Sequence, residues 1–304
     1  MKQVIDLSAI SPPAIVLPVS MEAIIADMKA DFLARGAADG VDLTDSLRES
    51  DPATKLVQTQ AFREGLLAAR INASNLANRV AFATGTDLDT LVAFADIERQ
   101  VIDPGNPAAS PPIAATTESD DRLRRRFVLH WNAISNGAPE GFYESLAMDM
   151  VPDVFDAYSV SPAPCEITVY VLPRPCADQA ACVAAVAAVM ANSKKVPQGD
   201  RVTVQLATVK PYRIVADLGV ASGPDSAVVV QAARAKVQAY AQWSEVYGAT
   251  PLGRSIEIPF VHAALAVAGV TAITVTEPAG PMACGPSEAA LCSEIVLTVN
   301  GVAP

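Results

Sequence analysis

The run from Pro52 to Gln100 contains no internal proline, and it constrains the fold of this 304-residue chain more than any other stretch. Asp51 and Pro52 suit the cap and the first position of a helix. Seven apolar residues then recur at alternating spacings of four and three: Phe62, Leu66, Ala69, Ala73, Leu76, Val80 and Ala83. This 3.5-residue period is typical of helices that pack side by side. The pattern predicts one helix over Pro52–Ala83, about 48 Å long at 1.5 Å per residue.

The apolar stripe from Phe62 to Ala83 has two interpretations. It can be the buried face of an ordinary amphipathic helix, or it can bundle with a helix of another subunit, whose approach the central alanines would allow. The residues alone do not choose between the two. After the stripe, Gly85 is predicted to cap the helix in a left-handed conformation, and a short second helix should carry Leu88, Leu91 and Val92 inward.

Composition excludes several classes of partner. The formal net charge is −11 and the sequence pI is about 4.7, so nucleic acid and anionic membranes are not expected as partners. The longest apolar run, 180–191, is shorter than the eighteen or more residues that a membrane-spanning helix needs. Residues 1–20 lack the pattern of a secretory signal, which predicts assembly in a cytoplasm.

The positions of proline and glycine, which end helices and strands, predict an α+β fold. In this fold a long-helix region is followed by two small modules that each combine a sheet with helices. The predicted segments are an extended arm at 1–19, a helical region at 20–102, a proline-rich linker at 103–117, and modules at 118–209 and 210–304. The linker is hypothesised to let the helical region and the modules reorient as rigid bodies. Pro211 is expected to break the strand 201–209 from the strand 212–220.

A helix is predicted after Ser119, which suits its N-cap. Its expected core stripe is Leu123, Phe127, Trp131 and Ile134. Its basic residues are Arg122, Arg124, Arg125 and Arg126, which point around most of the helix. This spread disfavours a phosphate-binding patch, so a solvated face or a salt-bridged subunit contact is expected.

No established catalytic or phosphate-binding motif is present in the sequence. The five cysteines match no common zinc spacing and the chain has only two histidines, so no metal, cofactor or small-molecule substrate is predicted. A hydrolase that uses Cys165 and His262 is the alternative with chemistry, although no oxyanion donor can be named for it. Cys284 and Cys292 are either free thiols, as cysteines are by default, or a disulfide that closes a loop.

Five motifs, in order along the chain, resemble the baseplate assembly protein J family of P2-like and Mu-like contractile tails. They are Gly85–Leu91, Glu118–Arg124, Val160–Pro164, Pro197–Val204, and the block from Leu252–Arg254 to Gly269–Val270. The resemblance runs from about Val4 to Val299, and the opening at Ile5–Leu7 fits the P2-like branch. Larger family members insert a barrel-like domain where this chain has only the short segment 103–117, so none is expected here.

The resemblance implies a structural role in the virion rather than an enzyme. Family members sit as two copies per baseplate wedge, link six wedges into a ring around the tail hub, and couple host contact to sheath contraction. The implied partners are a second copy of the chain, a baseplate protein of the I type, a small lysozyme-like wedge protein, and the hub and sheath. On this view the Phe62–Ala83 stripe serves the helical bundle and the 210–304 module serves the ring. A phage-unrelated oligomeric scaffold is the remaining alternative.

Overall fold

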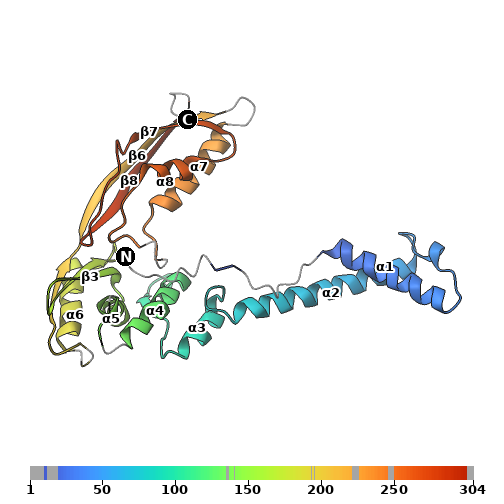
Figure 1. Cartoon of the computed structure of the whole chain (residues 1–304), viewed down its shortest axis with the longest axis horizontal. Helices are drawn as coiled ribbons and strands as arrows, with labels where there is room; N and C mark the ends of the chain where they lie inside the picture. Colours follow the sequence, from blue (N-terminus) through green and yellow to red (C-terminus); the bar gives the residue numbers. More distant parts are fainter. Residues whose placement is uncertain are drawn as a thin grey trace. The chain divides into compact units, whose positions relative to one another are not determined.

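The computed structural model describes residues 10–11, 20–134, 137–139, 141–192, 194, 196–220, 226–245 and 250–299. The fold is α+β, as the sequence predicts (Figure 1). The chain divides into two compact units, and the boundary between the helical unit and the unit that carries the sheets falls between Asp96 and Ile97. All of the predicted arm at 1–19 except residues 10 and 11 lies outside the described residues.

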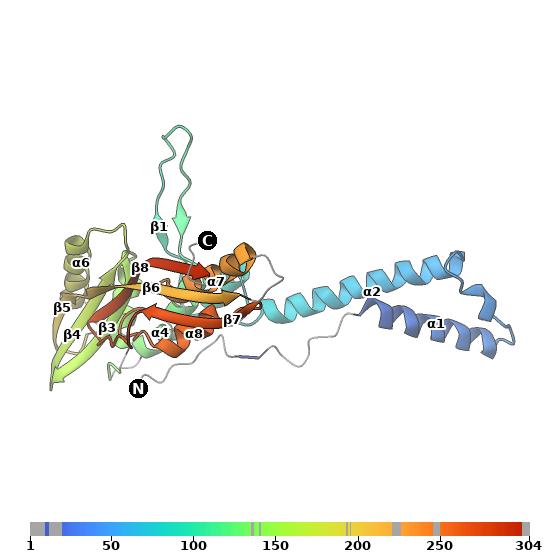
Figure 2. The same ribbon diagram turned by 90° about the horizontal axis from the view of Figure 1, so that it is seen from above.

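The helical unit is built on an antiparallel pair of helices (Figures 1 and 2). Its elements are α1 (Met21–Ala38), a short 3-10 turn at Thr44–Ser46, α2 (Pro52–Ala77) and α3 (Gly85–Ala93). Ser20 caps α1, because its hydroxyl oxygen accepts a hydrogen bond from the Ala23 amide at 3.3 Å. Leu88 and Val92 of α3 are fully buried, as the pattern predicts.

The long helix is shorter than predicted. It ends at Ala77, so its 26 residues span about 39 Å. The Asn78 side chain donates to the Ser74 carbonyl at 2.8 Å, which occupies a carbonyl at the end of the helix. Val80 and Ala83 consequently lie in the turn that follows α2. Gly85 does have a positive φ of 55°, but it begins α3 after the Thr84 cap instead of ending α2.

The second unit contains two small three-stranded sheets. The central module comprises α4 (Asp120–Ala133), α5 (Phe142–Met150), β3 (Val154–Ala163), β4 (Glu166–Pro173), α6 (Gln179–Asn192) and β5 (Arg201–Leu206). Its sheet has the order β3-β4-β5, in which β3 and β4 are antiparallel and α6 crosses over between the parallel strands β4 and β5. Its core lies between this sheet and the helices α5 and α6.

The C-terminal module comprises β6 (Thr208–Val220), α7 (Ser226–Ala241), α8 (Ile258–Leu265), β7 (Val270–Glu277) and β8 (Glu288–Val299). Its sheet has the order β7-β6-β8, with β7 antiparallel and β8 parallel to the central strand. Helices α7 and α8 cover one face of this sheet (Figure 1). Each module therefore buries a sheet against helices, as the sequence predicts.

Two boundaries within this unit differ from prediction. The strand break falls at Ala207, whose amide donates to the Val171 carbonyl at 2.9 Å, and β6 then runs straight through Pro211. Pro211 lies opposite Leu291 of β8, whereas β7 pairs with β6 only from Val215 onward. Among the described residues the strand therefore has a neighbour on one side only around Pro211, which suits a residue that lacks an amide hydrogen.

The segment 103–117 is not a linker between bodies but part of an antiparallel hairpin (Figure 2). Its arms are β1 (Val101–Asp103) and β2 (Thr116–Thr117), and the Glu118 amide donates to the Gln100 carbonyl at 2.9 Å where the arms meet. The prolines and the glycine that suggested a linker instead lie in the turn of this hairpin. The hypothesis that rigid bodies reorient at 103–117 therefore loses its basis.

Candidate assembly interfaces and the buried arginine core

The predicted stripe on α2 is largely on the surface. The buried residues of α2 are Thr54, Ala61 and Gly65, on the side that packs with α1. Of the predicted stripe, Phe62 is 56% exposed and Leu66 is 50% exposed, and Ala69 and Ala73 are also exposed; Leu76 and Val80 are half-buried, and Ala83 is buried. The described part of the chain therefore leaves the central members of the stripe open to a partner.

Helix α2 also carries a second apolar stripe, which was not predicted from the sequence. Leu56, Leu67 and Ile71 are exposed, and at 100° per residue they lie about 140° around the helix from the Phe62 stripe. Arg63 and Arg70 separate the two stripes. The i,i+4 pair Leu67 and Ile71 was the available signal. With one face on α1 and two exposed apolar flanks, α2 can contact two further helices.

The basic cluster after Ser119 is buried, which corrects the prediction of a solvated face or a subunit contact. Arg122, Arg125 and Arg126 are at most 5% exposed. The predicted core stripe of α4 is also only partly right, because Leu123 is buried but Trp131 and Ile134 are exposed, and Leu129 takes the core position instead. Helix α4 thus faces the interior with arginines as well as leucines.

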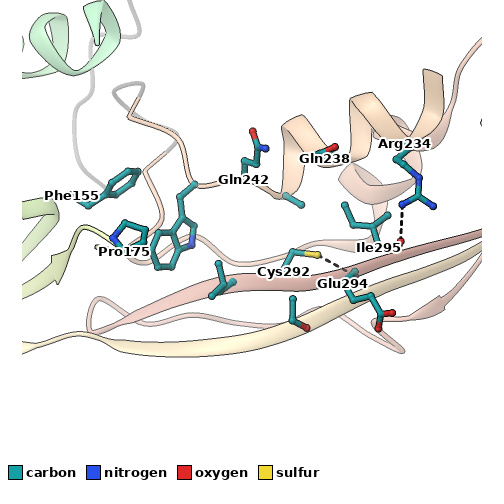
Figure 3. Close-up of a pocket in the computed structure, with 12 residues that line it drawn as sticks. Phe155, Pro175, Arg234, Gln238, Gln242, Cys292, Glu294 and Ile295 are labelled. Atoms are coloured by element: carbon teal, nitrogen blue, oxygen red, sulfur yellow. Dashed lines mark hydrogen bonds between the residues drawn. The ribbon is translucent and has the colours of Figure 1, made fainter. Parts of the chain in front are cut away.

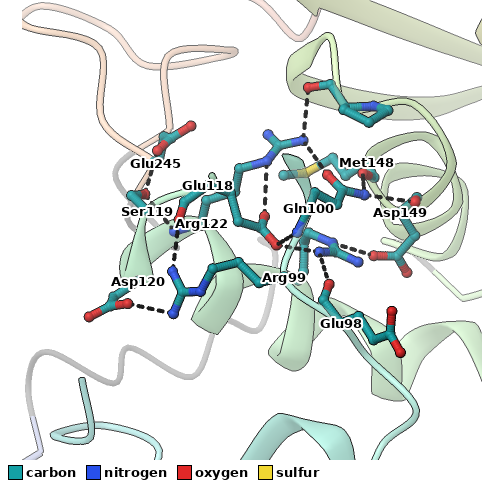
Figure 4. A network of polar contacts seen from close by, with 12 residues as sticks. Glu98, Arg99, Gln100, Glu118, Ser119, Asp120, Arg122, Met148, Asp149 and Glu245 are labelled. Atoms are coloured by element: carbon teal, nitrogen blue, oxygen red, sulfur yellow. Dashed lines mark hydrogen bonds and ion pairs between the residues drawn. The ribbon is translucent and has the colours of Figure 1, made fainter. Parts of the chain in front are cut away.

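Arg122 is the most enclosed member of this arginine core (Figure 4). It donates to the Val154 carbonyl at 2.7 Å, and its Nε lies 3.2 Å from Glu118 Oε2. Burial, followed by the nearby positive charge of Arg174, lowers the pKa of Arg122 to about 10. The guanidinium still remains charged near neutral pH, so it depends on its carboxylate partner.

Glu118 accepts or pairs with donors from two segments, helix α4 and the residue Gln100 at the hairpin base. Its carboxylate pairs with Arg122, accepts from Arg126 Nη1, and accepts from the Gln100 amide at 3.0 Å. Arg126 Nε in turn donates to Asp149 Oδ1 at 2.8 Å. The Glu118 carboxylate therefore joins the base of the β1–β2 hairpin to α4, and Arg126 extends the network to the end of α5 (Figure 4).

Asp156 makes a second buried junction, between the two modules. Its carboxylate accepts from Arg125 Nη2, from the Ala157 amide at 2.8 Å and from the Leu252 amide at 3.0 Å. An apolar cluster surrounds the junction, formed by Phe155, Leu172, Ala207, Leu252 and Ala289. Nearby, Glu245 accepts from Arg174 at 2.8 Å and from the Ser119 hydroxyl at 2.5 Å. These contacts fix the C-terminal module on the central one.

A groove of about 580 Å³ lies beside this junction, between α7 and β8 (Figure 3). Phe155, Pro175 and Trp243 form one end, and the rings of Phe155 and Trp243 lie 5.7 Å apart. Arg234 and Glu294 line the other end. The Ile295 carbonyl in its wall accepts from Arg234 at 3.1 Å, so the groove runs along a sheet edge that is partly covered by side chains.

The structure does not bring together the residues of the hydrolase alternative. Cys165 lies in the turn between β3 and β4 with a φ of 63°, whereas His262 lies on α8 of the other module. No hydrogen bond joins them among the described residues. Within the same residues no group of three or more potential ligands could hold a metal ion, and no helix is long and apolar enough to span a bilayer.

The predicted alternative of a Cys284–Cys292 disulfide is not formed, because all five cysteines are free. The Cys292 thiol points to the Glu294 carbonyl at 3.4 Å, and Cys284 is held through its amide by the Ser255 hydroxyl at 3.1 Å. Burial raises the pKa of both thiols. They are packed as small apolar residues at the edge of the C-terminal core.

Thiol alkylation of the folded chain at pH 8 checks this arrangement. Cys165 and Cys176 are exposed and should be labelled first. Burial raises the pKa of Cys182 to about 11, so roughly one thiol in a thousand is ionised at pH 8 and labelling should require unfolding. Mass spectrometry after unfolding without reductant should then find five labels. A protein that retains two unlabelled cysteines in this step would contradict the free-thiol assignment.

These features define an assembly protein, in which internal ion pairs fix the modules and the longest helix keeps apolar stripes on its surface. Residues 49–106 match the family model for the baseplate J-like N-terminal domain. Over 303 residues the chain is 31% identical to baseplate protein J of Escherichia phage P2, with 98% of each chain covered. The chain belongs to the baseplate protein J family, and it is a structural protein of the virion tail baseplate.

The chain is also similar in part to a chain in the six-fold symmetrised cryo-EM structure of the anti-feeding prophage baseplate. The sequence identity is 15% and the TM-score is 0.36. The match covers 60% of this chain and 44% of that chain, so the present chain spans less than half of that chain's length.

Proposed function

We propose that this chain is a wedge protein of a contractile-tail baseplate, with two copies per wedge and six wedges in a ring around the tail hub. Membership of the baseplate protein J family supports the location and the structural role. The single observation that carries the finer proposal is the pair of exposed apolar stripes on α2. An isolated chain gains nothing from keeping such surface in water, whereas a helical bundle buries it.

The two stripes suit two different occupants. Helix α1 already covers the face of α2 that carries Ala61 and Gly65, so both flanks remain for helices from outside the chain. We assign the Phe62–Ala73 flank to a protein of the I type, because its small alanines allow the closest approach. The flank formed by Leu56, Leu67 and Ile71 then faces the second copy of this chain.

The rest of the chain would form the ring. We assign contacts between copies to the C-terminal module, from β6 to β8, which the Asp156 junction holds on the central module. Contacts with the hub, the sheath and a small lysozyme-like wedge protein complete the proposed set of partners. Host contact would be coupled to sheath contraction by a movement at the boundary between the two compact units, which falls between Asp96 and Ile97.

Substitution in the Phe62 stripe tests the bundle. Leu66→Glu should lower co-purification with the I-type protein of the same particle at least tenfold, because burial of a leucine contributes about 1.5–3 kcal/mol and a carboxylate resists burial. Val41→Glu is the matched control, since Val41 is equally exposed at 50% but lies off α2. Unchanged recovery with Leu66→Glu, in a pull-down where the control also binds, would refute the assignment of this flank.

A further inference from the structure

The two sheets have four outer edges, and side chains block the edge at β3. The Ser159 amide donates to the Glu144 carboxylate at 3.1 Å, and the Val154 carbonyl accepts from Arg122 at 2.7 Å. Backbone groups that are already paired in this way cannot receive another strand. The outer edge of β3 is therefore blocked at Val154 and at Ser159.

The edge at β8 is closed in the same manner. The Ala290 carbonyl accepts from Trp243 Nε1 at 2.7 Å, and the Ile295 carbonyl accepts from Arg234 at 3.1 Å (Figure 3). Both donors come from α7 and the segment that follows it. These contacts fill the edge that lines the groove described above.

The edges at β5 and β7 remain, and they differ in protection. Strand β5 has six residues and begins with Arg201, and short strands and charged side chains are common ways to prevent edge pairing. Strand β7 has eight residues and no charge from Val270 to Thr276. Among the described residues no strand pairs with its outer side. Ile273 and Val275, which face the core, are only half-buried there.

We infer that β7 pairs in an antiparallel manner with β7 of a second copy of this chain, across a two-fold axis. The inference rests on the proposed contact between C-terminal modules and specifies its geometry. An edge strand with no strand beside it among the described residues is a template for pairing with another extended backbone, and Val270–Thr276 of β7 carries no charge. Pairing would join the two sheets into one six-stranded sheet and cover the flanks of Ile273 and Val275.

Charge selects the antiparallel direction. The whole chain carries a net charge of −11, so an uncharged strand is a favourable place for two copies to approach each other closely. Glu277 is the only charged residue of β7. Parallel pairing would set the two Glu277 carboxylates side by side, whereas antiparallel pairing with Thr274 opposite its own counterpart separates them by about 20 Å. The same register places Ile273 opposite the second copy's Val275 on the core face.

Cross-linking of the full chain tests this register. In a background with Cys165→Ser and Cys176→Ser, Thr274→Cys should give a covalent dimer under mild oxidation, because directly opposed residues of antiparallel strands have Cβ atoms about 4.5–5.5 Å apart. Thr203→Cys is the matched control, since Thr203 is also exposed but lies on β5. Equal cross-linking at both positions, or none at Thr274→Cys, would overturn the inference.

Sedimentation velocity over a concentration series gives the second measurement. Thr274→Lys should weaken dimerisation roughly fivefold or more, because like charges directly opposed across strands are destabilising, while Thr203→Lys should not change it. A dimer that is insensitive to Thr274→Lys refutes the β7 pairing but leaves the contact between copies intact. A chain that stays monomeric, and whose Thr274→Lys variant still assembles into baseplates, refutes the β7 pairing without affecting the bundle proposal.

Discussion

Replacing Asp156 by alanine is expected to lower the free energy of unfolding by about 3–5 kcal/mol, the usual cost of leaving a buried charge without its partner. Asp156 is 1% exposed, and its carboxylate is the counter-ion of the buried Arg125. The same change leaves the Leu252 amide without its acceptor. Because this amide belongs to the C-terminal module, the contact between the modules should weaken together with the core.

Denaturant unfolding of the full chain measures this effect. Asp121→Ala is the matched control, because Asp121 is an exposed carboxylate that pairs with Arg124 at 2.8 Å, and pairs open to water contribute about 0–1 kcal/mol. Two separate unfolding transitions in the Asp156→Ala variant would indicate that the modules have lost their coupling. A loss no larger than that of Asp121→Ala would contradict the role of Asp156 as the junction between the modules.

Glu118→Gln should produce a loss of similar size, about 3–5 kcal/mol, even though the side chains are nearly the same shape. The amide cannot neutralise Arg122 and Arg126, which both meet this carboxylate in the interior. The Gln100 amide would keep an acceptor, so the hairpin base should be affected less than α4. The loss of charge, rather than of volume, is therefore the cause of the expected destabilisation.

The control for this variant is Glu98→Gln. Glu98 has an exposed side chain, and it contacts Arg126 only through its backbone carbonyl, at 3.1 Å. The free energy of unfolding of the Glu98→Gln variant should therefore stay within about 0.5 kcal/mol of that of the parent protein. Comparison of the denaturation midpoints at pH 7 decides the matter. Equal stability of the two variants would mean that the arginine core does not need the Glu118 charge.

The sequence predicted the fold class and most elements because their signals are local. The Ser119 and Ser20 caps, the apolar periodicities, and the strand and helix order of both modules all follow from residues a few positions apart. The family resemblance likewise depended on short motifs and is confirmed by the match over 98% of the chain. The end of α2 was missed because Asn78 stops the helix with neither glycine nor proline.

The arginine core could not be predicted from its own segment. Arg125 pairs with a carboxylate 31 residues away, and Arg126 pairs with Asp149, 23 residues away, as well as with Glu118, so part of the compensating charge comes from distant segments of the sequence. A charged helix therefore looked like a surface helix. The i,i+4 pair of Glu118 and Arg122 was a local hint, but such pairs are equally common on exposed helices.

The hairpin formed by 101–117 enters and leaves the fold through adjacent backbone, since Gln100 and Glu118 are hydrogen-bonded to each other. These hydrogen bonds close the base of the hairpin. The distance between the two ends of the hairpin therefore does not depend on how many residues the hairpin contains. A lineage could therefore lengthen, trim or replace this appendage while the frame that carries it stays in register. The short proline-rich tip of this chain is one form of a segment whose length can vary.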